Sequence, residues 1–313
     1  MQSERKPCYC PEQVGWLMAG LFHLYISYSS DLFPFSWLQK TEDLKVRCRD
    51  SIREKTTFSI SPELLQAIHK CERVTAPEKT LGLPSDWGFS GFMKTAAHQV
   101  LDEVPFTKAE EFQGPLFRRL GIGIIINSHP RIKGEQIFYL HHNHWSCMIR
   151  DRSSTVNTKL QENSRDYLLK SELLAVTSIF YRQMNEMVWL SEENRYMAKP
   201  IYKEGFLAAT IVTFIYGKVR IVQATCDPSE TNPMLTLTLR AVYDLGKDNY
   251  DRKVAFDILK WIFCPPEPAK ELAIRRKRAT TIPGASAVPG ATDFAVPGAT
   301  DVPDLVTIDA RST

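Results

Sequence analysis

Residues 205–226 read GFLAATIVTFIYGKVRIVQATC, and residues 234–245 read MLTLTLRAVYDL. In the second run Leu235, Leu237 and Leu239 alternate with polar residues, and this period of two is typical of a strand with one buried face. The first run is rich in β-branched residues, which pack well on a sheet. The two runs therefore predict strands over 210–225 and 234–242.

The link inside the first run predicts a hairpin. Gly217 and Lys218 fit the central positions of a type II′ turn, because glycine suits the first of these positions. A helix that ends at Gly217 is the alternative interpretation. Downstream, an apolar segment predicts a buried helix over 250–264, with Asp248 or Asn249 as its N-cap.

The other periodic segments complete the expected architecture. We expect helices over 14–28, 62–72, 93–103, 165–194 and 250–264, and strands over 120–127, 136–149, 210–225 and 234–242. The strands come as hairpin-like pairs, and they do not alternate with single crossover helices. The sequence therefore predicts an α+β fold, a mostly antiparallel sheet covered by helices.

Composition divides the 313 residues into three parts. With 43% hydrophobic and 24% charged residues, the chain is typical of a soluble globular protein. We expect a flexible arm over 1–12, one globular domain over 13–268, and a basic run with a disordered Pro/Gly/Ala-rich tail over 269–313. The tail repeats AVPGATD, and so little apolar surface cannot offset the entropy cost of ordering.

Charge and cysteine usage limit the partners and the compartment. A net charge of +3 is too small to indicate a nucleic-acid partner. The apolar run 14–26 is shorter than the roughly 20 residues that span a bilayer, so we expect no membrane segment. Seven scattered cysteines without a C-x-x-C pair favour a reducing compartment, the cytoplasm or the nucleus.

A short basic run could direct the chain to the nucleus. It consists of Arg275, Arg276, Lys277 and Arg278. Such runs serve as nuclear-import signals. The alternative is a solvated helix end.

One local cluster, HHNHWSC at 141–147, carries residues suited to chemistry. If this segment is one strand, His142 and His144 share a face, because side chains at i and i+2 point the same way. Two imidazoles so placed could bind zinc with a further ligand such as Asp151, or one of them could act as a general acid or base. The alternative is a polar surface with neither role. No cofactor other than this zinc is predicted.

The segments GKVRIVQATCDPSETNPMLTLTLRAVYDL (217–245) and DILKWIF (257–263) are similar to segments of uncharacterised proteins of filamentous fungi. The resemblance covers only part of the chain and contains no catalytic motif. It implies no particular fold or activity, but genes for such proteins often lie beside those of biosynthetic enzymes.

Two functional hypotheses follow. The first is a non-catalytic interaction or regulatory protein with an unknown protein partner, indicated by the lack of a catalytic signature, the basic run and the tail. The second is a small-molecule enzyme, for example for an accessory step of a biosynthetic pathway, with His142 or His144 as the acid–base group or metal ligand.

Overall fold

The structure is a computed structural model that describes residues 10–40, 45–54, 58, 60–104, 132–141, 143–153, 165–193 and 195–263. Residues 1–9 of the expected arm, the strand expected over 120–127 and the tail from residue 264, with its basic run, lie outside the described residues.

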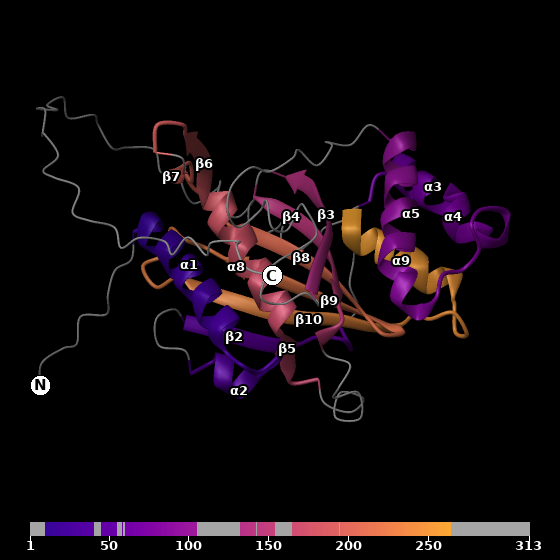
Figure 1. Cartoon of the computed structure of the whole chain (residues 1–313), viewed down its shortest axis with the longest axis horizontal. Coiled ribbons are helices and arrows are strands. Elements are labelled where there is room, and N and C mark those ends of the chain that lie inside the picture. The colour runs from indigo at the N-terminus through magenta and orange to yellow at the C-terminus, as the bar shows by residue number, and fades with distance from the viewer. Residues whose placement is uncertain are drawn as a thin grey trace, which may run out of the picture.

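A six-stranded mixed sheet forms the centre of the molecule, in the order β2-β10-β9-β8-β4-β3 (Figure 1). Its strands are β2 (Lys45–Asp50), β3 (Ile132–His141), β4 (His144–Asp151), β8 (Leu207–Ile215), β9 (Lys218–Cys226) and β10 (Met234–Asp244). Three neighbouring pairs are antiparallel, whereas β2 with β10 and β4 with β8 are parallel. The predicted α+β fold with a mostly antiparallel sheet is confirmed.

Two small antiparallel ribbons accompany the central sheet. Strand β1 (Leu32–Pro34) pairs with β5 (Tyr167–Leu169). Strand β6 (Asn185–Leu190) pairs with β7 (Arg195–Pro200). In Figure 1 the second ribbon extends from the C-terminal end of α8 (Lys170–Met184), away from the sheet.

Helices α1 (Pro11–Ser27) and α8 pack side by side on one face of the sheet (Figure 1). They cover Leu235, Leu237 and Leu239 of β10, which are fully buried, as the alternating pattern predicts. All fifteen residues of α8 are buried, because the helix lies between the sheet and α1. We call this layer the first core.

The opposite face of the sheet carries a second core, formed with α3 (Pro62–Lys70), α4 (Glu72–Thr75), α5 (Phe89–Glu103) and α9 (Arg252–Phe263). Successive side chains of a strand point to opposite faces. Ile211 of β8 therefore belongs to the first core and Val212 to the second. The short helix α2 (Phe35–Leu38) and two 3-10 turns, Pro77–Lys79 and Asp86–Gly88, complete the described elements.

The predicted hairpin of 210–225 is confirmed, and the helix alternative is wrong. Strands β8 and β9 pair antiparallel around the two-residue loop Tyr216–Gly217. Gly217 has a φ of +64°, which favours glycine. It takes the second loop position, so the type II′ turn with Gly217 first is wrong.

The helix over 250–264 is confirmed, with a different cap. Helix α9 starts at Arg252, and the Asp251 carboxylate accepts a hydrogen bond from the Lys253 backbone N–H at 2.8 Å. Asn249 instead accepts from the Gly246 N–H. The cap is therefore Asp251, and the prediction of Asp248 or Asn249 is wrong.

Two other predicted elements are divided in the structure. The expected helix over 165–194 begins as β5 and ends as β6, because each end finds a partner strand that the local apolar period does not show. The expected strand over 136–149 is the β3–β4 hairpin. The Asn143 side-chain amide donates to the Phe206 carbonyl at 2.7 Å and holds this turn against the start of β8.

None of the described helices combines the length and the apolar character that crossing a bilayer requires.

Candidate functional site

The histidine cluster is not arranged as a single strand would arrange it. Strand β3 ends at His141 and β4 begins at His144, so the hairpin turn separates them. His142 is outside the described residues. The single strand on which the expectation of a shared face for His142 and His144 rested is divided, because β3 ends at His141 and β4 begins at His144.

His144 itself lies inside the protein. Its side chain is buried, and the ring nitrogen Nε2 lies 3.0 Å from the hydroxyl of Thr210 on β8. Among the described residues there is no group of three or more His, Cys, Asp or Glu side chains that could hold a metal ion. A zinc site at His142 and His144, and catalysis by either residue, remain predictions.

His144 belongs to a polar part of the second sheet face. The sheet register places five residues of five neighbouring strands in one transverse row, Ser146, Thr210, Gln223, Thr238 and Arg49. The next row contains His144, Ala208, Thr225, Thr236 and Arg47. The apolar residues of the second core lie further along the same strands, so this face changes from apolar to polar. We call the two rows together the polar rows.

Exposure rises along the polar rows toward β2. Ser146 and Thr210 are fully buried, Thr236 is half-buried, and Arg47 and Arg49 are exposed. Within the described part of the chain, the Ser146 hydroxyl has no hydrogen-bond partner. The rows therefore run from the interior to β2, the outermost described strand on this side of the sheet.

The guanidinium of Arg240 lies near the middle of this sheet face and binds two neighbouring polar side chains. Arg240 donates from Nε and Nη2 to the Gln223 side-chain oxygen, at 2.9 and 2.7 Å. Its Nη1 donates to the Ser51 hydroxyl at 3.3 Å. Burial lowers the pKa of Arg240. Gln223 is thereby fixed in place beside Thr238.

Strand β2 lies at the exposed end of the polar rows and carries three cationic side chains. Lys45, Arg47 and Arg49 point to the polar side and are exposed, whereas Val46 and Cys48 point to the first core. Arg49 pairs with Glu54. Among the described residues, Lys45 and Arg47 have no carboxylate partner. We call Lys45, Arg47 and Arg49 the basic row.

Strand β2 was not predicted, although its sequence contains a weak strand pattern. Residues 45–49 read KVRCR, a strict alternation of charged and apolar residues. Two apolar residues alone are a weak strand signal. The strand that pairs with β2, β10, lies far away in the sequence, so the residues around β2 could not predict its place in the sheet.

A second polar group lies in the first core, at the start of α8. Arg220 of β9 donates from Nε to the Glu172 carboxylate at 2.8 Å, and both side chains are buried. Glu172 also accepts from the Leu169 N–H at 2.8 Å, and Arg220 donates to the Tyr167 carbonyl at 3.0 Å. This pair joins α8 and β5 to the sheet.

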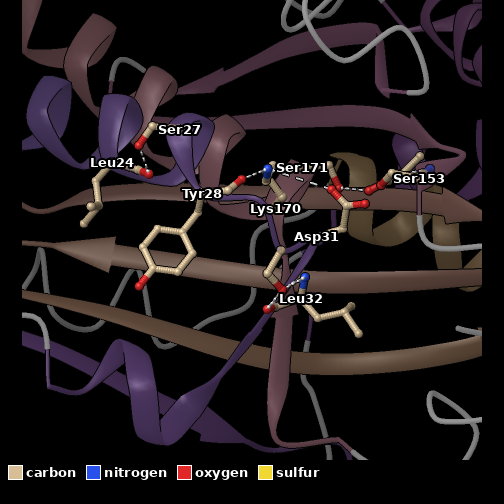
Figure 2. Close-up of polar contacts among 10 residues, drawn as sticks. Leu24, Ser27, Tyr28, Asp31, Leu32, Ser153, Lys170 and Ser171 are labelled. Carbon is tan, nitrogen blue, oxygen red and sulfur yellow. Dashed lines mark hydrogen bonds and ion pairs between the residues drawn. The ribbon is translucent and has the colours of Figure 1, made fainter.

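Lys170 and Asp151 extend this group, and Figure 2 shows the contact between Lys170 and Tyr28. Lys170 Nζ donates to the Tyr28 carbonyl and lies 3.9 Å from an Asp31 carboxylate oxygen. The Asp151 carboxylate accepts from the Ser171 and Ser153 hydroxyls, each at 2.5 Å. Burial raises the pKa of Asp151 and lowers that of Lys170.

The arrangement of this group is suited to holding elements together. Lys170, Ser171 and Asp151 are fully buried, and each is engaged by a neighbour from another element. Sequence reasoning missed it because charged residues at a helix start are usually exposed. A signal was present in KSE at 170–172, directly after the apolar YLL.

A small hollow lies where the start of α1 meets the base of the β6–β7 ribbon. Its lining consists of Pro11, Glu12, Gly15, Met184, Asn185, Pro200 and Tyr202. Its free volume of about 10 Å³ holds roughly one water molecule. It is too small for an organic substrate.

Comparisons of the chain with protein-family models, with curated proteins and with solved structures found no match.

Proposed function

We propose that this chain is a non-catalytic interaction protein that contacts a protein partner through the basic row of β2. It works inside the cell, in the cytoplasm or in the nucleus, and Arg275–Arg278 is its import signal in the second case.

One observation carries the proposal, namely the position of the basic row on β2, the outermost described strand on its side of the sheet. Lys45, Arg47 and Arg49 share one exposed face, and Val46 on the other face is anchored in the first core. Exposed cations fixed on a rigid strand steer and orient an oppositely charged partner. The buried charges of Lys170, Glu172 and Arg220 are instead engaged within the fold.

A photo-crosslink tests the proposal. Arg53, exposed just after β2, is replaced by the photoreactive p-benzoylphenylalanine, and Lys253 on α9 is replaced in the same way as the control site. We expect a protein adduct in cell extract from position 53 alone. Excess wild-type protein should suppress it, and the Lys45→Glu/Arg47→Glu variant should not. Adducts that both competitors suppress equally would contradict the proposal.

The second proposal, a small-molecule enzyme, is supported by the place of His144 in the polar rows beside Thr210 and Ser146. Metal analysis of the purified, folded protein tests its zinc form. This form requires about one zinc per chain that is lost in His144→Ala. A folded wild-type protein without zinc would contradict it.

A further inference from the structure

We infer that the partner of β2 is an acidic extended segment that adds to the sheet as a further strand, with acidic residues at alternate positions. This inference rests on the proposed function and names the chemistry and the geometry of the same contact.

The edge position of β2 provides the backbone part of the contact. Among the described strands, β2 pairs with β10 alone, and among the described helices the short α2 contacts β2. Such an edge offers N–H and C=O groups to an incoming strand. Val46 and Cys48 hold β2 on the first core, so the edge is already formed before a partner arrives.

The basic row provides the side-chain part. In an added strand, residues i, i+2 and i+4 share one face and lie about 6.6 Å apart, which is the spacing of Lys45, Arg47 and Arg49 along β2. Directly opposite residues of neighbouring strands have Cβ atoms about 5 Å apart. Carboxylates at alternate positions of the partner would therefore lie opposite the three cations.

Charged residues also protect edge strands from unwanted pairing, and this is the competing explanation of the basic row. Repulsion between the cations of two copies of β2 opposes self-pairing, whereas the same cations attract an acidic strand. The basic row can therefore both protect β2 from unwanted pairing and select an acidic strand. Only the second explanation predicts that an acidic peptide binds to β2.

The surroundings of the row favour an acidic peptide over a nucleic acid. Proteins that bind single strands combine cations with aromatic side chains on which bases stack. The exposed large apolar residues of the described chain, Trp16, Tyr28, Leu81, Trp189, Met197, Ile201 and Tyr216, lie outside β2 and β10. The residues beside the row on β10 are Thr236 and Thr238, which have short side chains.

Two fluorescein-labelled peptides of the same composition test the inference. One reads Thr-Glu-Thr-Glu-Thr-Glu-Thr and the other Thr-Thr-Glu-Glu-Glu-Thr-Thr. In fluorescence anisotropy we expect the alternating peptide to bind about 10-fold more tightly, since it alone places all three acids opposite the row. Lys45→Glu/Arg47→Glu should weaken its binding about 10-fold or more. The control Lys203→Glu/Lys253→Glu, with the same charge change at exposed lysines elsewhere, should bind as wild type does.

Hydrogen exchange supplies a readout for the backbone. We expect amides of 45–50 to become protected when the alternating peptide binds. Equal binding of the two peptides, or binding without this protection, would overturn strand addition and leave the proposed contact surface standing. Tighter binding of a single-stranded oligonucleotide of equal charge would overturn the peptide class. If neither peptide binds and the photo-crosslink also fails, the proposed function fails as well.

Discussion

The guanidinium of Arg220 on β9 lies 2.8 Å from the carboxylate of Glu172 at the start of α8, and both side chains are buried. Two residues far apart in the chain thus fix how the first helical layer meets the sheet. The ring of Tyr167 lies over the same guanidinium, with 4.7 Å between the guanidinium carbon and the ring centroid.

Removing one partner of this pair should destabilise the protein strongly. Arg220→Met leaves the Glu172 carboxylate buried without its guanidinium, and we expect a loss of about 3–5 kcal/mol in the free energy of unfolding. The double variant Glu172→Leu/Arg220→Met should lose less than the sum of the two single variants. Urea unfolding measures all three. Additive losses would show that the two side chains do not interact. As a control, Lys218→Met at the exposed pair with Asp244 should change the free energy of unfolding little.

The raised pKa of Asp151 predicts a pH dependence of stability. Burial raises this pKa in the folded state above the unfolded value of about 3.9. Between the two values the folded protein keeps a proton that the unfolded chain releases, so stability falls as pH rises through that window. Asp151→Asn should remove this part of the fall. Urea unfolding at a series of pH values from about 4 upward measures it, with the exposed Asp248→Asn as control. Parallel curves for wild type and Asp151→Asn would contradict this explanation.

Part of this architecture could be predicted from the sequence. The leucine alternation of 234–239 identifies β10, because a period of two is a local property. The β3–β4 turn was missed because the segment HHNH contains no glycine or proline, and Asn143 is its one turn-favouring residue. The site was harder to predict, since the polar rows join five strands through register, which no local pattern contains.

The cysteines should react in the order of their burial. Burial raises the pKa of both Cys147 and Cys226 to about 12, and the thiolate is the reactive form. In native protein at pH 8 we expect iodoacetamide to modify the exposed Cys10 long before either of them. Peptide mass spectrometry follows each site. Alkylation of Cys147 as fast as that of Cys10 would show that the first core opens readily.

Alanine substitutions at two glycines should show the effect of backbone conformation on stability without a steric clash of the added side chain. Gly217 has a φ of +64°, whereas Gly20 lies on the exposed side of helix α1. At both positions an added Cβ would meet no atom within 4 Å. Gly217→Ala should therefore lose about 1 kcal/mol through the left-handed conformation alone. Gly20→Ala should gain roughly 0.5–1 kcal/mol, because alanine favours a helix. Thermal or urea unfolding of both variants checks the opposite signs, and a neutral Gly217→Ala would contradict the loop geometry.

The central claim is that the cations of β2 contact a protein partner, and competition for the photo-crosslinked adduct at position 53 tests it most directly. The competitors are wild-type protein, Lys45→Glu/Arg47→Glu and Lys203→Glu/Lys253→Glu, each first shown to unfold at the same urea concentration. We predict that the wild type and the second variant suppress the adduct, and that the first does not. Suppression by all three proteins alike would contradict the claim.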